Sequence, residues 1–335
     1  MKNLETESYI SNIQQYLIDS YVETENFTAF LEQHHKHCYW MIFSDYSFKP
    51  RFPKKPAITA TIIPFSDYRW IQTICRLSQL KTNLDIKKTY INEKHISFIN
   101  FIEGLPAFHI SLLVDENLNY YKNEKINEKE YFKRYFDGVK VHYSNHINYA
   151  LAQPNPKMNI GNIDRVLKLL NERPKIRIFK QSQIVSSLIS SISKMIVDST
   201  KVECKILWCS DNDDILSYSE DSLLYPFVFD MIRTDLYRLR PQKMYQIDFL
   251  KKVTKDFDEL VRIPDYIVGT ISDLNLEEVT VTHEKFLPVL YSFLTNSNKN
   301  LVINLTNISN KIELTKYEFK KLVEKEPNWS TYRWK

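Results

Sequence analysis

Four aspartates stand where buried segments of this chain end, and together they could hold metal ions. Apolar runs typical of buried strands precede three of them: "WMIFS" comes before Asp45, "HISLLV" before Asp115 and "KILWCS" before Asp211. The fourth, Asp265, follows Pro264, a residue favoured in the first turn of a helix, so we expect a late helix to begin there. Carboxylates brought together take up protons unless a cation lies between them. Mg²⁺ or Mn²⁺ suits such a set, and all four are candidate metal ligands and catalytic residues.

Paired metal ions of this kind have a recurrent use in phosphodiester hydrolysis. Two ions about 3.5–4 Å apart can activate water on one side of the phosphorus and stabilise the leaving oxygen on the other. A phosphatase or nucleotide hydrolase could use the same ions on a small substrate. The structural alternative is that the aspartates only close turns and cap a helix, as aspartate commonly does.

A basic loop, "KPRFPKKP", follows the first aspartate and has aromatic residues interleaved. Such a loop could hold the nucleic-acid backbone beside the acidic site and stack a base. The alternative is a solvated loop that only keeps the protein soluble. The four candidate nucleic-acid-binding residues are Lys49, Arg51, Lys54 and Lys55.

Composition excludes several other classes of protein. No apolar stretch reaches the roughly 20 residues of a membrane-spanning helix, so we expect no membrane partner. Only four glycines occur in 335 residues, too few and too scattered for a glycine-rich phosphate loop. The four cysteines have neither zinc spacing nor disulfide density, which predicts no structural disulfide and a reducing cytoplasm.

Two further charged motifs have simple structural interpretations. "HHKHC", residues 34–38, contains zinc-ligand types, but basic residues also favour the carboxyl end of a helix. "RTDLYRLRPQK", residues 233–243, is typical of a solvated helical face.

Strands and helices alternate along the chain, which favours an α/β fold. We expect two amphipathic helices within residues 3–35 and a largely helical segment over 118–200. Strands are predicted at about 38–44, at "AITATIIPF", "LDIKKTYI", "AFHISLLV", "VECKILWC", "KMYQIDF" and "NLVINL". Further helices are predicted at about 66–80, at "EKHISFINFIEGL", around 225–239, after Pro264 and at the C-terminus.

The order of these motifs resembles a bacterial ribonuclease-H-like family of unknown function, whose first strand ends in Asp-Glu-Ser-Gly. Here that motif is "DYSF", residues 45–48, so Tyr46 stands in place of the acid. A second strand with a proline near its end follows, here "ITATIIPFSDY"; then come strands that end in aspartate, "LPAFHISLLVDEN" and "KILWCSD", and a helix, "IPDYIVGTI". The match covers roughly residues 38–115 and 202–275, and it assigns the family's acidic site to the same four aspartates.

The resemblance implies a mixed sheet flanked by helices. It divides the chain into a helical N-terminal extension (1–36), a core in two parts (37–117 and 201–305), a helical insertion (118–200) and a C-terminal helix and tail (306–335). It implies a Mg²⁺- or Mn²⁺-dependent nuclease, a hydrolase acting on DNA or RNA. It also suggests a role in defence against phage or mobile DNA beside a partner ATPase or other defence-system protein. The alternative is an inactive ribonuclease-H-like module that binds nucleic acid or a protein partner.

Overall fold

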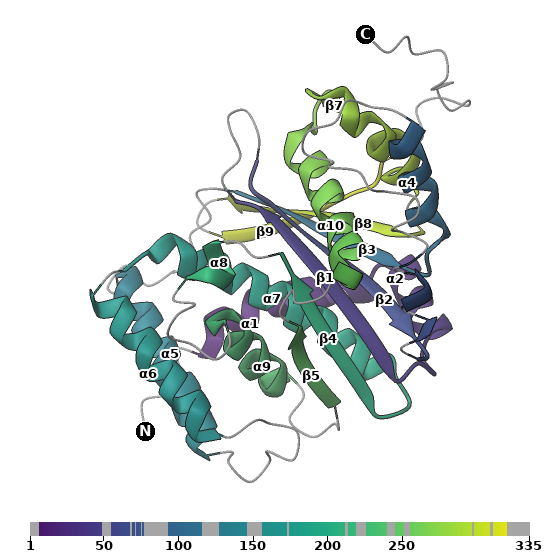
Figure 1. Cartoon of the computed structure of the whole chain (residues 1–335). Coiled ribbons are helices and arrows are strands. Elements are labelled where there is room, and N and C mark those ends of the chain that lie inside the picture. Colours follow the sequence, from purple (N-terminus) through teal and green to yellow (C-terminus); the bar gives the residue numbers. More distant parts are fainter. Residues whose placement is uncertain are drawn as a thin grey trace.

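The structure, a computed structural model, describes most of the chain (Figure 1). The described residues are 7–48, 55–67, 69–70, 72–74, 76, 93–115, 127–145, 156–172, 174–211, 214–218, 226–239, 245–250, 255–296, 298–308 and 311–319.

A mixed sheet forms the centre of the molecule, and the described residues contribute seven strands to it. In spatial order the strands are β5 (Tyr245–Leu250), β4 (Cys204–Ser210), β1 (Tyr39–Ser47), β2 (Ala57–Phe65), β3 (Phe108–Val114), β8 (Asn300–Ile308) and β9 (Lys311–Tyr317). The strands β1, β2 and β3 form an antiparallel meander, and β4 and β5 extend the sheet in parallel beside β1. On the other side β8 is parallel to β3 and β9 is antiparallel to β8. This arrangement, flanked by helices, is consistent with the ribonuclease-H-like α/β fold.

The strand directions bring several carboxyl ends to one edge of the sheet. Since β2 is antiparallel to both β1 and β3, the strands β1 and β3 point the same way, and β4, β5 and β8 follow them. We call the edge where these five strands end the carboxyl edge. In open α/β sheets, ligands commonly bind outside this edge.

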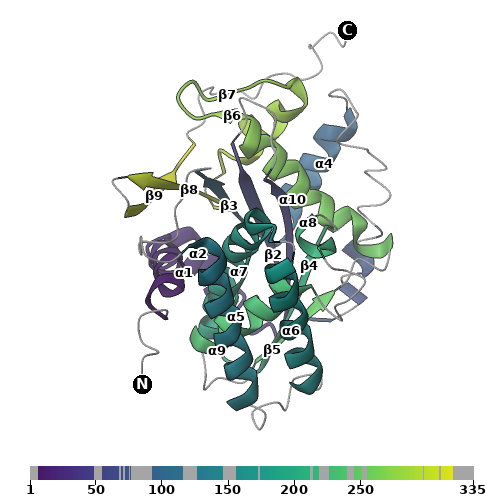
Figure 2. The same cartoon turned by 90° about the vertical axis from the view of Figure 1, so that its left-hand side faces the viewer.

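Both faces of the sheet are covered, which explains why the central strands are apolar on both sides. Every residue of β2 is buried, as expected for a strand between two helical layers. One face packs on α1 (Glu7–Val22), α2 (Glu25–Gln33), α7 (Ile176–Ser199), α8 (Asp214–Ser217) and α9 (Phe227–Leu239). The other face packs on α4 (Glu93–Gly104), α10 (Lys255–Asp273), the 3₁₀ turn η2 (Glu284–Phe286) and the π-helical segment η3 (Val289–Phe293). Figure 2 shows the two layers on opposite sides of the strands.

A helical pair lies outside the first layer. The helices α5 (Glu128–Asn145) and α6 (Pro156–Glu172) lie side by side, on the far side of α7 and α9 from the sheet (Figures 1 and 2). Aromatic side chains fill the space between this pair and the layer of α7 and α9. Phe132 and Phe136 of α5 contact Phe179 of α7, and Phe136 also contacts Phe227 of α9.

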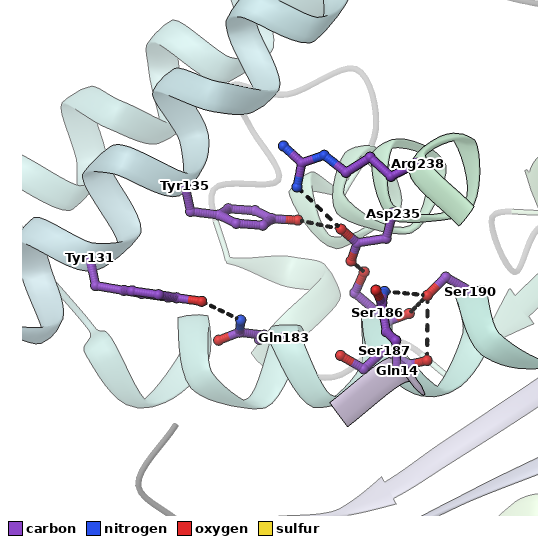
Figure 3. Close-up of polar contacts among 9 residues, drawn as sticks. All are labelled: Gln14, Tyr131, Tyr135, Gln183, Ser186, Ser187, Ser190, Asp235 and Arg238. Atoms are coloured by element: carbon purple, nitrogen blue, oxygen red, sulfur yellow. Dashed lines mark hydrogen bonds and ion pairs between the residues drawn. The ribbon is translucent and has the colours of Figure 1, made fainter. Parts of the chain in front are cut away.

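Buried polar contacts also tie this pair to the layer beneath it (Figure 3). The Tyr135 hydroxyl donates to the Asp235 carboxylate at 3.2 Å, and the Ser186 hydroxyl donates to the same carboxylate at 2.6 Å. The Gln183 amide of α7 donates to the Tyr131 hydroxyl at 2.8 Å. Because buried polar groups are costly unless they are paired, these bonds fix how α5 sits on α7 and α9.

Most of the predicted elements are present, with three differences. The segment 118–200 is helical where it is described, although α7 within it covers the sheet directly. A helix was expected after residue 306, but residues 311–317 form β9, and residues 320–335 lie outside the described part. Pro264 was expected in a first helical turn, but it lies inside α10. The predicted strand "LDIKKTYI" lies outside the described residues.

Candidate carboxylate site at the carboxyl edge

Asp45 lies within β1, close to the carboxyl edge. The strand was expected to end at Asp45, but it continues to Ser47, and Asp45 pairs with Thr59 of β2. Side chains alternate between the two faces of a strand. Met41 and Phe43 face the α10 layer, so Asp45 faces it as well, and only 7% of its surface is exposed.

Asp265 reaches this position from α10, which packs across β1, β2 and β3. The helix begins at Lys255, so Asp265 follows ten helical residues and cannot cap the helix. The capping interpretation of Asp265 is therefore wrong. Ile263, Tyr266 and Ile267 beside it are buried against the sheet and dock the helix there. The side chains of Asp265 and Asp45 are joined by a hydrogen bond.

The surroundings of Asp45 favour its protonated form. Burial raises the pKa of the Asp45 carboxyl well above its usual value, and the charge of Asp265 and the hydrogen bond to it raise it further. A hydrogen bond from the Tyr46 backbone acts the other way and lowers the pKa. Adjacent carboxylates repel each other unless a cation lies between them. A cation between the two carboxyls would offset this repulsion and favour the ionised form of Asp45.

Asp211 belongs to the same cluster through its charge. It directly follows β4, whose last residue, Ser210, pairs with Ser44 of β1. The next residue along each strand is an aspartate, so Asp211 and Asp45 lie at the same level of neighbouring parallel strands. The charge of Asp211 also raises the pKa of Asp45. We call Asp45, Asp211 and Asp265 the carboxylate site.

Asp115 lies at the same edge but apart from the carboxylate site. It follows β3, and its backbone N–H donates to the Leu305 carbonyl of β8 at 2.9 Å. The register pairs Thr59 with Ser111, so Asp115 is four residues beyond the level of Asp45 and two strands away. Those offsets amount to about 13 Å along the strand and about 10 Å across it. The structure thus brings together three of the four predicted aspartates.

Tyr46, which stands where the resemblance led us to expect an acid, points away from the carboxylate site. Its ring stacks on Phe48 at 5.7 Å, and both pack against the opposite face of the sheet, on the α7 side. Its hydroxyl accepts from the Ser210 hydroxyl at 2.7 Å and lies 2.8 Å from the Ser44 hydroxyl. A side chain at position 46 therefore does not face Asp45 and Asp265.

The donor atoms of the site fit a hard cation with few protein ligands. Among the described residues, no group of three or more His, Cys, Asp or Glu side chains is placed to hold a metal ion. The hydrogen-bonded carboxyls of Asp45 and Asp265 offer a closely spaced oxygen pair, with a third negative charge nearby. Mg²⁺ is commonly bound by one or two carboxylates, with water and substrate phosphate completing its shell. The pair fits that type of site.

The predicted basic loop is described only at its end. Lys55 is exposed and lies two residues before β2 begins, whereas Lys49, Arg51 and Lys54 lie outside the described residues. The segment HHKHC, residues 34–38, shows contacts of the kind found at a helix end: the His37 ring nitrogen lies 3.1 Å from the His34 carbonyl.

The predicted solvated face on α9 is wrong at its centre. Arg233 is 4% exposed, and Asp230 and Asp235 are buried in the same helix. Each aspartate lies three residues before an arginine and 4.0 Å from its guanidinium, and each accepts from a tyrosine of α5. The repeated Asp-x-x-Arg spacing was a sequence signal for these pairs, but it does not indicate burial.

Comparisons with protein-family models, curated proteins and solved structures give no match for this chain.

No helix in the described part is long and apolar enough to cross a membrane. No disulfide joins the three described cysteines, Cys38, Cys204 and Cys209.

Proposed function

We propose that this protein is a divalent-metal-dependent nuclease that hydrolyses phosphodiester bonds of DNA or RNA at the carboxylate site. The observation that carries the proposal is the convergence of Asp45, Asp211 and Asp265 from two strands and a helix onto one place at the carboxyl edge. A turn or a helix cap needs none of these side chains to meet. Their convergence supports a function that uses several carboxylates at once.

In this proposal Asp45 and Asp265 hold Mg²⁺ or Mn²⁺. When bound, such an ion polarises the phosphoryl oxygen and lowers the pKa of water. The chain's own residues supply the oxygen ligands and their fixed spacing. Burial of Asp45 limits competing water on its side, and Asp211 adds a negative charge that favours a divalent cation. Asp115, the fourth ligand expected from the sequence, lies apart from this pair and has no part in the proposed metal site.

The basic loop is the proposed nucleic-acid contact. Lys55 is exposed at the carboxyl edge and could bind the phosphate backbone, and Lys49, Arg51 and Lys54 are predicted to extend that contact. We also propose, from the family resemblance, a cytoplasmic role in defence against phage or mobile DNA beside a partner ATPase or other defence-system protein. This wider role rests on analogy at the level of the fold.

A second candidate is an inactive ribonuclease-H-like module that binds nucleic acid or a protein partner. The observation that favours it is the raised pKa of the buried Asp45 carboxyl, because a protonated Asp45 hydrogen-bonded to Asp265 needs no metal. Among the described residues, no group of three or more His, Cys, Asp or Glu side chains is placed to hold a metal ion, and this also favours the inactive module.

Cleavage of labelled DNA and RNA, single-stranded and duplex, separates the two candidates. The panel is incubated with Mg²⁺, with Mn²⁺ and with a chelator, using the native protein, Asp45→Ala and Asp164→Ala. Asp164 is an exposed residue of α6 that pairs with Lys140, so its variant controls for loss of a carboxylate elsewhere. The nuclease requires metal-dependent cleavage that persists in Asp164→Ala and disappears in Asp45→Ala. Binding without cleavage under every condition supports the inactive module.

A further inference from the structure

We infer that Ser272 is a positioning residue, which fixes the exposed cation Lys55 relative to the helix that carries Asp265. The inference rests on the proposed function, because it assigns Lys55 to the phosphate contact of the same site. It adds to that proposal the residue that holds the Lys55 cation at a fixed position relative to the carboxylates of Asp45 and Asp265. We call the three hydrogen-bonded residues Ser47, Lys55 and Ser272 the serine clamp.

The hydrogen bonds of the serine clamp form a consistent chain of donors and acceptors. The Ser47 hydroxyl donates to the Ser272 hydroxyl at 3.0 Å, and the Ser272 hydroxyl donates to the Lys55 carbonyl at 2.7 Å. The Lys55 backbone N–H returns a bond to the Ser272 carbonyl at 3.0 Å. Each hydroxyl donates once, and Ser272 is 2% exposed, so water competes little for these bonds.

The clamp lies next to the carboxylate site on both of its elements. Ser272 is seven residues, or about two helical turns, beyond Asp265, and so on the same side of α10. Ser47 is two residues beyond Asp45 and on the same face of β1. The bonds therefore join α10 to the carboxyl end of β1 and to Lys55, which lies two residues before β2 begins.

The backbone around Lys55 is fixed from the other side as well. The carbonyl of Pro56, the next residue, accepts a bond from the Val114 N–H at the end of β3. The Lys55–Pro56 segment is thus held between α10 and β3, and the Lys55 side chain is exposed there. An ammonium group on a backbone fixed in this way can bind a phosphate at a defined place relative to Asp45 and Asp265.

Two serine variants separate positioning from general support of the fold. Ser272→Ala removes the hydroxyl bond to Lys55, whereas Ser47→Ala removes a bond of the same cluster and keeps both bonds to Lys55. Lys55→Ala reports the loss of the cation itself. Lys201→Ala is the charge control, since Lys201 is an exposed lysine before β4, at the opposite edge of the sheet.

The experiment measures binding of short fluorescent single-stranded DNA and RNA over a series of salt concentrations, in chelator, so that cleavage does not enter. We expect Lys55→Ala to reduce the slope of log affinity against log salt by about 1, as for loss of one phosphate contact. Ser272→Ala should weaken binding about three- to tenfold and reduce the slope in the same direction. Ser47→Ala and Lys201→Ala should match the native protein. Ser272→Cys, of nearly the same volume but a weaker donor, replaces Ser272→Ala if that variant does not fold.

Native-like binding and slope in Ser272→Ala, beside weaker binding in Lys55→Ala, would overturn the positioning role and leave the proposed function intact. Equal weakening in Ser272→Ala and Ser47→Ala would also overturn it, because Ser47→Ala keeps the bonds to Lys55. If the native protein binds neither probe, the inference falls together with the proposed function. Binding without cleavage in the separate metal assay removes only the nuclease.

Discussion

Replacing Asp235 by asparagine should remove a large pH dependence from the stability of this protein. Asp235 is 1% exposed and lies where α5, α7 and α9 meet (Figure 3). Burial raises the pKa of its carboxyl to about 6, even though bonds from Ser186 and Tyr135 and the charge of Arg238 lower it. The ordinary value is 3.8. Asparagine is close in shape and does not titrate.

The magnitude follows from the difference between the two pKa values. A carboxyl whose folded pKa is raised contributes its full stability below the unfolded pKa, and it loses that stability as pH rises through the folded pKa. A shift of about two pKa units corresponds to about 3 kcal/mol over the whole range, of which about 2 kcal/mol is lost between about pH 4.5 and pH 7. The variant has a constant cost from altered hydrogen bonds but lacks this slope.

Urea unfolding of both proteins at several pH values measures the effect. The difference between variant and native protein is the informative quantity, because other groups titrate in the native protein. Burial lowers the pKa of His34 and His95 to about 4 and that of His109 to about 3. These histidines act in the opposite direction, since they destabilise the fold as pH falls. Their contribution is common to both proteins and cancels in the difference.

The free energy of unfolding of Asp235→Asn, relative to native, should therefore rise by about 2 kcal/mol between about pH 4.5 and pH 7. A difference that stays flat over this range contradicts the reasoning, because it means that Asp235 is ionised at the same pH in both states. Ser186→Ala gives a second check: loss of its 2.6 Å bond should raise the pKa of Asp235 further and steepen the loss of stability.

Three other predictions concern single positions. Gly161→Ala in the interior of α6 should raise the free energy of unfolding by about 1 kcal/mol in urea, because the added methyl meets nothing within 4 Å beyond its chain neighbours and the backbone of its own helix; a lower stability would contradict this. Val279 has a left-handed backbone, with φ at 53°, so Val279→Gly should be about 1 kcal/mol more stable than Val279→Ala; equal stabilities would exclude strain there. Asp115→Asn should retain most of any metal-dependent cleavage, whereas Asp265→Asn should lose it; equal loss would place Asp115 in the catalytic site.

The sequence allowed the strands to be predicted because their apolar runs are long and rich in β-branched residues. The run "AITATIIPF" became β2 with the predicted bounds, since a strand buried on both faces is a nearly continuous run of apolar and β-branched residues, and here only Thr59 and Thr61 are polar. Pro264 misled the helix prediction. Proline favours a first turn, but α10 is docked by apolar residues on both sides of Pro264, and this packing sets its extent.

The candidate site was predictable in its members but not in its geometry. Aspartates at the ends of parallel strands indicate a common edge, and that argument located Asp45 and Asp211. It could not separate Asp115, because the two-strand offset depends on the insertion of β2 between β1 and β3. The serine clamp carries no sequence signal, since Ser47 and Ser272 are distant in the chain and serine is common at the ends of elements.

Binding of Mn²⁺ to the metal-free protein tests the central claim most directly, because it needs no knowledge of the substrate. The paramagnetic signal of free Mn²⁺ is titrated with native protein, Asp45→Asn, Asp265→Asn and Asp164→Asn. If Asp45 and Asp265 hold the ion, native protein and Asp164→Asn should bind it alike, and the other two variants should lose most of the binding. Native protein that binds no Mn²⁺, or an Asp45→Asn variant that binds it unchanged, would contradict the account.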